Sequence, residues 1–334
     1  MQHSIFRSRF WYRGTFIALL TVTALVVASL FTGCPSSNGG NDNDDGNGYG
    51  NGDVSIFPVT IVDDTGRTIT IESEPQKIIS LAPSNTEIAF ALGLDDKIIG
   101  VTTYCDYPAT ALDKPKVGGF STVDIEQVTA TQPDLILAAN MHVDEIVPQL
   151  ENLGLTVVVV NPRGLDEILD SITMVGQVTG VIDAAKALVD DMQSRINAVT
   201  SKVAGLTDTE KPKIFFVIWH DPLKTAGPDT NHFAIIETAG GISVSRGMAD
   251  GFPSVGLEEL VAANPDIMIS DTGMGSGGSL PYQFIAEDTR LAGTNARING
   301  NIYQIDSNIV NRAGPRIVDA LEAMAEIIHP ELFG

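Results

Sequence analysis

The chain has 334 residues, which is enough for one or two domains with a full core, and its 42 Asp and Glu against 20 Lys and Arg give a formal net charge of −22. Because phosphate contacts need a basic face, this charge argues against a nucleic-acid-binding protein. The acidity is typical of a solvated surface and does not by itself indicate a cation site.

The first part of the chain has the pattern of an export signal. Arg7, Arg9 and Arg13 precede the uncharged apolar run 15–31, and small residues lead up to Cys34. This order predicts a signal peptide over 1–33, and the Cys at its end predicts lipoprotein processing with an acylated Cys34. Phe31 departs from the usual lipoprotein pattern, which has Leu there, and the run is almost long enough to remain as an uncleaved membrane anchor.

Residues 34–53 are predicted to form the lipid anchor and a disordered tether. The stretch 35–53 is rich in Gly, Asn and Asp and contains no apolar run that could stabilise an ordered structure. A tether between a lipid anchor and a folded domain places that domain outside the cytoplasmic membrane, in a periplasm or on the outer face of the cell.

The first half of the folded part alternates short strands with helices. Residues 55–73 alternate apolar and polar side chains around an Asp-Asp-Thr-Gly turn, which predicts a β-hairpin. Strands are then expected at 77–83, 97–104, 133–139 and 155–160, and helices at 84–94, 124–131 and 143–154. Ser84 and Glu87 have the spacing of a capping box at the start of the helix 84–94.

A strand-free stretch separates this half from a second one like it. Residues 165–180 and 181–206 predict helices, the second of about seven turns because apolar residues recur every three or four positions. The α/β pattern then resumes with strands at 211–219 and 301–306, helices at 231–241 and 314–328, and a helix followed by a strand within 256–270. The domains expected are a hairpin at 54–75, an N-terminal lobe at 76–164, a helical linker at 165–208 and a C-terminal lobe at 209–334.

A segment predicted to form a helix followed by a strand occurs twice in the sequence, at 124–138 and at 256–270. In each copy a glutamate, Glu126 or Glu258, stands seven positions before a Pro-Asp pair. The sequence therefore predicts an α/β protein of two pseudo-symmetric lobes with parallel sheets, joined by a single long helix.

Seven motifs, taken in order, make the chain similar to the substrate-binding proteins of ABC importers, and within them to the class that serves cobalamin, ferric siderophores and haem, which includes vitamin B12-binding proteins. They lie at 81–93, 99–108, 125–138, 149–160, 238–241, 257–269 and 311–321, and the likeness spans about 76–328. This resemblance implies a class III periplasmic-binding-protein fold, in which a rigid interlobe helix limits closure to a few degrees.

The resemblance also implies that each lobe presents one surface glutamate to a dimeric permease. By motif match these are Glu126 and Glu258; Glu259 lacks the seven-residue offset. Two carboxylates on two similar lobes suit two symmetric subunits, because charge complementarity sets orientation and association rate. The alternative is that each glutamate lies in a first helical turn only because the helix dipole favours it.

The ligand is expected in the cleft between the lobes, at the loops that follow the strands. The expected ligand contacts are Ser84, Asn85, Tyr104, Phe120, Trp219, Phe252 and Arg312. Aromatic faces suit a flat macrocycle, although Trp219 and Phe252 could equally be packing residues. Phe120 and Phe252 stand where B12-binding proteins usually have Trp, which is a departure from their pattern. A corrinoid is nevertheless the first expectation, and a ferric siderophore or haem is the second.

Other functional classes have weaker support. No catalytic motif occurs in a context that gives it a mechanism, so we expect no enzyme activity, no catalytic residues and no catalytic cofactor. His142, His220 and His232 lack metal-ligand spacing, and Cys105 has no expected disulfide partner. The expected partners are a permease dimer with its ATPase subunits, the ligand and the membrane, with the protein itself a monomer. A metal-ion receptor and a receptor that feeds a sensor remain open alternatives.

Overall fold

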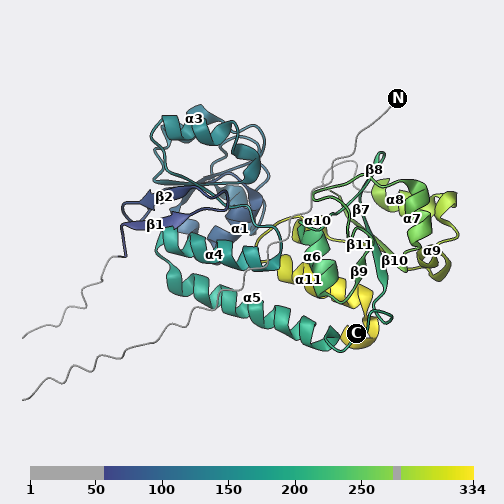
Figure 1. Cartoon of the computed structure of the whole chain (residues 1–334). Coiled ribbons are helices and arrows are strands. Elements are labelled where there is room, and N and C mark those ends of the chain that lie inside the picture. Colours follow the sequence, from purple (N-terminus) through teal and green to yellow (C-terminus); the bar gives the residue numbers. More distant parts are fainter. Residues whose placement is uncertain (1–55, 274–279) are drawn as a thin grey trace, which may run out of the picture. The chain divides into compact units, whose positions relative to one another are not determined.

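The computed structural model describes residues 56–273 and 280–334 (Figure 1). The predicted signal peptide, Cys34 and the tether lie outside these residues. Among the described helices, none is both long and apolar enough to span a membrane.

The predicted hairpin is confirmed and is anchored through its turn. Strands β1 (Val59–Val62) and β2 (Thr68–Ile71) pair antiparallel, with Val59 opposite Ile71. The Asp63 carboxylate accepts hydrogen bonds from the backbone N–H groups of Thr65, Arg67 and, farther along the chain, Val159, at 3.0–3.1 Å. Burial raises the pKa of Asp63, but its hydrogen bonds, above all that from the Arg67 side chain, outweigh burial and hold the pKa below its usual value.

The N-terminal lobe is built on a parallel four-stranded sheet in the order β4-β3-β5-β6. Its strands are short and buried: β3 (Ile78–Ser80), β4 (Ile98–Val101), β5 (Leu135–Ala138) and β6 (Val157–Val159). The helices that connect them are α1 (Pro83–Ala91), α2 (Ile125–Ala130) and α3 (Ile146–Asn152). Apolar runs without polar alternation form such strands because both faces of the sheet are covered.

The C-terminal lobe repeats this topology and adds one strand. Its sheet has the order β11-β10-β7-β8, with β9 also pairing with β7. The strands are β7 (Lys213–His220), β8 (Leu223–Thr225), β9 (Ile242–Ser243), β10 (Ile267–Asp271) and β11 (Ile302–Ile305). The order β9-β7-β10-β11 matches β4-β3-β5-β6 strand for strand, and only β8 runs antiparallel.

The helices of the second lobe are more numerous than the sequence predicts. The predicted ones correspond to α6 (Asn231–Thr238), α7 (Leu257–Ala263) and α11 (Ile317–Ile328). The additional ones are α8 (Leu280–Glu287), α9 (Asn295–Asn299), α10 (Ser307–Val310) and α12 (Pro330–Phe333). Most of these are a turn or two long, too short to show a helical hydrophobic period.

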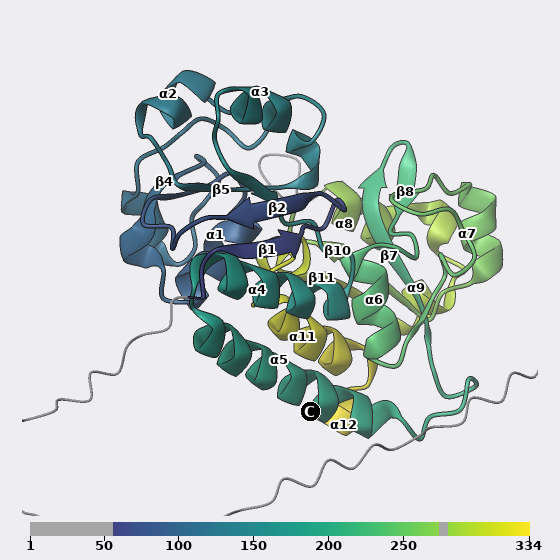
Figure 2. The same ribbon diagram turned by 60° about the vertical axis from the view of Figure 1, so that its left-hand side comes forward.

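Two helices join the lobes, α4 (Leu165–Thr179) and the longer α5 (Ile182–Val203), and Figure 2 shows α5 running along one side below α4 and α11. At Gly176 a Cβ atom would lie only 2.3 Å from the Ala185 Cβ, so the close approach of α4 and α5 requires glycine there. One hydrophobic core includes buried residues of both sheets, both linking helices and α11.

The capping box expected at the start of α1 is wrong. The helix begins at Pro83, its N-cap is Ala82, and no side chain caps it. The Glu87 side chain instead bonds to Arg312 and Arg316 of the other lobe. The S-x-x-E pattern is short and does not determine the hydrogen-bond partner of Glu87. Its carboxylate therefore accepts hydrogen bonds from two distant arginines and not from the backbone at the start of α1.

Candidate functional site

The duplicated passage occupies the same place in both lobes. Asp134 and Asp266 each follow a proline and precede the strand β5 or β10. The Asp134 carboxylate accepts the N–H of Lys77 at 2.9 Å, and the Asp266 carboxylate accepts that of Lys213 at 2.9 Å. In return each aspartate donates its own N–H to the carbonyl of the same lysine at 2.8 Å. The Pro-Asp pair therefore fixes the start of the central strand of each lobe.

The residue before each proline also has the same unusual backbone conformation. Gln132 has φ 50° and Asn264 has φ 48°, the two described non-glycine residues with positive φ. This left-handed conformation ends α2 and α7 and turns the chain into the next strand. The repetition is thus a matter of backbone geometry as well as of sequence.

Glu126 and Glu258 are the second residues of α2 and α7, and both are exposed. Neither side chain has a hydrogen bond or ion pair within the described residues. Other groups cap the two helices: the Asp124 carboxylate accepts the N–H of Gln127, and the Glu259 carboxylate accepts that of Gly256, both at 2.9 Å. Helix capping therefore does not account for Glu126 or Glu258, although the helix dipole still favours an acid at either place.

Four predicted aromatic contacts lie on loops or strand ends at the carboxyl side of the sheets. Tyr104 follows β4, Phe120 precedes α2, Trp219 is near the end of β7, and Phe252 precedes α7. Tyr104, Trp219 and Phe252 are 63%, 40% and 48% exposed, so their rings are accessible for contact with another molecule. Phe120 and Phe252 each stand six positions before the exposed glutamate of their lobe, so they belong to the same repeat.

Each of these phenylalanines contacts a buried histidine. The His142 ring meets Phe120 edge to face at a centroid distance of 5.5 Å. His142 Nε2 donates to the Phe120 carbonyl at 2.7 Å, and Nδ1 accepts the Ala139 N–H at 3.0 Å. Burial lowers the pKa of His142, while the bond to Phe120 partly opposes that effect. Both bonds suit the neutral ring, which holds the Phe120 loop in place.

In the C-terminal lobe His232, which lies on α6, contacts Phe252 at a centroid distance of 6.2 Å. Its Nε2 donates to the Asn311 side-chain oxygen at 2.9 Å, because the Asn311 amide nitrogen donates to Asp271 at 2.6 Å. Burial lowers the pKa of His232 to about 4. The sequence did not indicate the role of either histidine, since neither lies near its phenylalanine in the chain.

Ser84 and Asn85 are less accessible than expected. Asn85 is fully buried, and its side-chain amide donates to the Ala138 carbonyl at 2.9 Å. This bond holds α1 against β5, so Asn85 supports the fold. Ser84 is partly buried at the start of α1.

Arg312 is occupied by protein groups. Its Nη1 donates to Glu87 at 2.9 Å and to Asp106 at 2.6 Å, and its Nη2 donates to Asn308 at 2.8 Å. Burial lowers the pKa of Arg312, but its hydrogen bonds to Asp106 and Glu87 outweigh burial and raise the pKa. In this structure Arg312 joins the two lobes, and only the Asp106 end of the arrangement is well exposed.

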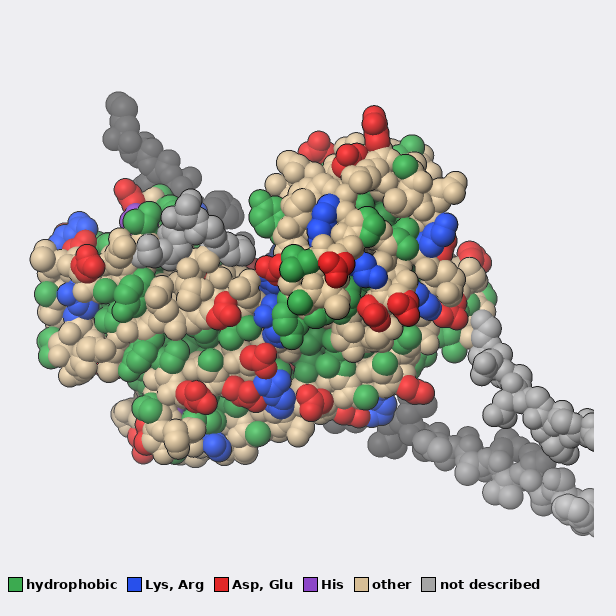
Figure 3. Space-filling view, turned by 180° about the vertical axis from the view of Figure 1, so that it is seen from behind, with side chains coloured by type: hydrophobic (Ala, Val, Ile, Leu, Met, Phe, Trp, Pro, Cys, Tyr) green, Lys and Arg blue, Asp and Glu red, His purple; other side chains and the backbone are tan. Residues whose placement is uncertain are grey.

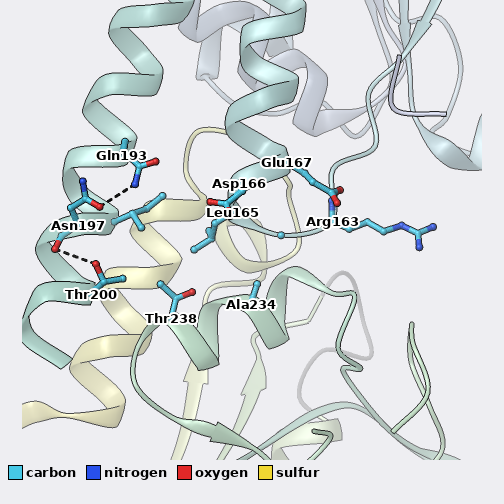
Figure 4. A pocket seen from close by; sticks show the side chains of 11 residues that line it. Arg163, Leu165, Asp166, Glu167, Gln193, Asn197, Thr200, Ala234 and Thr238 are labelled. Atoms are coloured by element: carbon cyan, nitrogen blue, oxygen red, sulfur yellow. Dashed lines mark hydrogen bonds between the residues drawn. The ribbon is translucent and has the colours of Figure 1, made fainter. Parts of the chain in front are cut away.

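The structure has two cavities that lie away from the expected ligand contacts. A cavity of about 490 Å³ lies between the start of α4, the middle of α5 and α6. In Figure 4 Gln193, Asn197 and Thr200 of α5 line it opposite Ala234 and Thr238 of α6. A second, of about 370 Å³, lies between α1, α5 and α11. No predicted ligand residue lines either cavity. Figure 3, which views the molecule from behind, shows a notch in the surface between the lobes.

The remaining groups are the possible metal ligands and the Cys105 thiol. Within 56–273 and 280–334, no three His, Cys, Asp or Glu side chains are grouped as a metal site. Cys105 is fully buried, and its sulfur lies 3.1 Å from the Thr86 hydroxyl and 3.2 Å from that of Thr102. It packs as a small residue of the core.

Comparisons with known proteins place the chain among solute-binding proteins. The model of the periplasmic binding protein family matches residues 78–309. The Bacillus subtilis ABC transporter substrate-binding lipoprotein YvrC is 33% identical over 316 residues, 92% of this chain and 96% of the relative. A cobalamin-binding protein of Halobacterium salinarum is 29% identical, over 82% of this chain and 74% of its own. A possible iron-binding, periplasmic solute-binding protein of Staphylococcus epidermidis has a solved structure with TM-score 0.67 and 30% identity, covering 77% of this chain and all of that one.

Proposed function

Since the chain belongs to the periplasmic binding protein family, as a substrate-binding protein of the ABC-transporter type, we propose that it captures cobalamin or a related corrinoid between its lobes and delivers it to a permease. No chemistry is performed on the ligand. The observation that carries the proposal is the set of aromatic side chains at the carboxyl side of both sheets, with Phe120 and Phe252 at equivalent places in the two lobes.

The ligand contacts we propose are Tyr104, Phe120, Trp219 and Phe252, with Ser84 at their border. Exposed aromatic faces from two lobes provide apolar area for a large, flat macrocycle, and their rings are rigid, so little side-chain entropy is lost on binding. The relative in Halobacterium salinarum that is named for cobalamin binding supports a corrinoid. Arg312 would contact the ligand only where an anionic group of the ligand displaced Asp106.

Glu126 and Glu258 are proposed as the docking groups for the permease. Both are exposed, unpaired within the described residues, and placed at the same position of equivalent helices. A pair of carboxylates related by the pseudo-symmetry of the lobes can meet basic groups on two permease subunits at once. ATP hydrolysis by the associated ATPase subunits then drives release of the ligand.

We further propose that Cys34 carries the lipid anchor and that residues 35–53 tether the binding unit to it. The relative named a lipoprotein in Bacillus subtilis matches over 92% of this chain, which supports an anchored, extracytoplasmic receptor. Incorporation of a labelled fatty acid by the parent, and its loss in Cys34→Ser, tests this. A parent that takes up no fatty acid yet stays in the membrane fraction would mean that 15–31 remains in place as a membrane anchor.

Trp219 makes a direct test of the ligand possible, because the only other tryptophan is Trp11 in the predicted signal peptide. Fluorescence titration with cyanocobalamin should quench Trp219 at micromolar concentration or below. Phe120→Ala and Phe252→Ala should each weaken binding by roughly tenfold or more, by loss of aromatic contact area. Unchanged Trp219 fluorescence at micromolar cyanocobalamin would contradict the corrinoid proposal.

Haem or a ferric siderophore is the second candidate ligand. The related structure from Staphylococcus epidermidis, a possible iron-binding protein at 30% identity, favours it. Titrations with haem and with ferric siderophores, run beside that with cyanocobalamin, separate the candidates directly.

A further inference from the structure

Four charged side chains, Glu87, Asp106, Arg312 and Arg316, form ion pairs between the lobes and are here called the interlobe ion cluster. Glu87 lies on α1 of the N-terminal lobe, whereas Arg312 and Arg316 precede α11 of the C-terminal lobe. Arg312 and Arg316 are 225 and 229 residues from Glu87 in the chain. Acidic and basic side chains meet along the junction of the lobes in Figure 3.

The bonds within this cluster are directional. Arg316 Nε donates to one Glu87 oxygen at 2.8 Å and Nη2 to the other at 2.6 Å, which is a bidentate, planar arrangement. The Arg316 guanidinium also lies 3.8 Å from the centre of the Tyr107 ring. Its plane is therefore fixed from two sides, both belonging to the N-terminal lobe.

Burial strengthens these contacts. The Glu87 side chain is 2% exposed, and those of Arg312 and Arg316 are 10% and 17% exposed, so water screens the charges little. Asp106 is 52% exposed and completes the outer side. The backbone is close here as well, because a Cβ on Gly314 would lie 3.3 Å from the Ser84 carbonyl oxygen.

Apolar packing is incomplete beside the cluster. The cavity of about 370 Å³ is lined by Glu87 and Arg316 themselves, together with Phe90 of α1 and Leu188 and Met192 of α5. The hydrophobic core shared by the two lobes does not fill this place, which leaves space there for small rotations. Directional ion pairs at such a place can restrict those rotations.

We propose that the interlobe ion cluster sets the relative orientation of the two lobes, which makes Glu87 and Arg316 positioning residues for docking. This inference rests on the proposed function, since it concerns the separation of Glu126 and Glu258. When both glutamates must bind at once, a fixed separation keeps the effective concentration of the second high after the first has bound. The motifs 81–93 and 99–108 supply the two acids of the cluster, and the motif 311–321 supplies both arginines.

The experiment measures the separation directly. Nitroxide labels on Ala130→Cys and Ala262→Cys, exposed equivalent positions on α2 and α7, report the distance between the two docking helices by pulsed electron resonance. The full chain carries Cys34→Ser, and Cys105 is fully buried, so we expect no label there. The double variant Glu87→Gln/Arg316→Gln removes the bidentate pair and leaves Arg312 bonded to Asp106, so no buried charge is left unpaired.

We expect a single narrow distance distribution in the parent and a clearly broader one in the double variant. Affinity for the permease in nanodiscs should fall roughly tenfold, as expected when the two docking groups are no longer held at one spacing. Ligand affinity should fall less. Arg246→Gln is the matched control, since it breaks an ion pair with Glu237 inside one lobe, and it should change neither distribution nor docking.

Two results would overturn the inference. One is an unchanged distance distribution in the double variant while circular dichroism shows it folded. The other is a broadened distribution with unchanged permease affinity. Failure of the proposed function is distinguishable, because in that case reversing Glu126 and Glu258 would leave permease affinity unchanged while the distance measurement still responded to Glu87 and Arg316.

Discussion

In the N-terminal lobe helix α2 is capped by an aspartate that precedes it, Asp124, whereas in the C-terminal lobe the cap of α7 is Glu259, which lies inside the helix and reaches back. The backbone that these different side chains support is the same, down to the positive φ of Gln132 and Asn264. The comparison shows that the two lobes have the same backbone geometry at this passage but use different side chains to cap the helix. A side chain that is retained in both lobes without capping either helix is therefore a candidate for function, and Glu126 and Glu258 meet that description.

The two histidines extend this comparison. His142 follows β5, while His232 lies on α6, so they are not equivalent in the repeat, yet each contacts the phenylalanine at the equivalent position. His142 holds the backbone of Phe120 directly, whereas His232 bonds to Asn311 and touches Phe252 only through its ring. The support of the Phe120 loop is accordingly the more rigid.

Charge reversal at the docking groups should have the largest effect. Glu126→Lys with Glu258→Lys should abolish uptake of the ligand by cells, because attraction to basic groups on the permease becomes repulsion. Ligand affinity measured by Trp219 fluorescence should stay within about twofold, since neither residue is an expected ligand contact. Uptake by cells that make only this receptor measures the first effect.

Each single reversal should impair uptake by a similar factor if the lobes are equivalent in docking. Glu326→Lys, an exposed acid on α11, is the control for the change in net charge. Normal uptake by the double reversal would contradict the docking proposal and favour a receptor for a sensor.

Acid should destabilise the C-terminal lobe through His232. Its pKa is lowered from 6.5 to about 4 by burial, so the native state holds the neutral ring and the stabilisation is complete above pH 6.5. As the pH falls from 6.5 to about 4 the unfolded chain binds the proton first, and the free energy of unfolding should drop by up to roughly 3 kcal/mol.

Denaturant unfolding from pH 7 to pH 4 of the parent, His232→Gln and His142→Gln measures this contribution. The dependence on pH should flatten in both variants, because burial lowers the pKa of His142 too. An unaltered pH dependence in His232→Gln would mean that the ring is not held neutral.

The Pro-Asp pairs should contribute similarly in the two lobes. Asp134→Ala removes the acceptor of the Gln76 and Lys77 N–H groups, and Asp266→Ala that of the Lys213 N–H and the Asn295 amide. Each should lower the free energy of unfolding by roughly 2 kcal/mol, since donors lose their partner. Chemical denaturation of both variants measures this; a loss confined to one lobe would show that only one pair is structural.

The helix caps should give the smallest effect and the clearest asymmetry. Asp124→Ala should cost about 1 kcal/mol, the usual value for a lost N-cap. Glu259→Ala should cost less, roughly 0.5 kcal/mol, because Gly256 remains as an acceptable N-cap residue. Thermal unfolding compares the two, and equal losses would remove this distinction between the lobes.

Much of the fold could be predicted from the sequence because its signals are local. The buried strands β3, β5 and β10 are apolar runs bounded by turn residues, and α5 has a regular helical period. Strand β8 was missed because three residues beside a hairpin turn carry no pattern of their own. The duplicated passage gave the equivalence of the lobes, which no single element would have shown.

The candidate site could be predicted less completely, since much of it depends on contacts between distant segments. Glu87 looked like a local cap and is instead bonded to arginines more than two hundred positions away. Arg312 was expected to face the ligand for its charge, but the sequence does not show which acids lie nearby. The histidine beside each phenylalanine is likewise brought there only by the folded chain.

The contact at Gly176 has a consequence for how a permease could tell a loaded receptor from an empty one. Helices α4 and α5 approach each other so closely there that no side chain fits between them, and two helices packed in this way bend less easily than one helix alone. We therefore expect the outlines of the two forms to be nearly superimposable. The permease would then distinguish the loaded from the empty receptor by the ligand exposed in the cleft between the lobes and not by a change in the shape of the receptor.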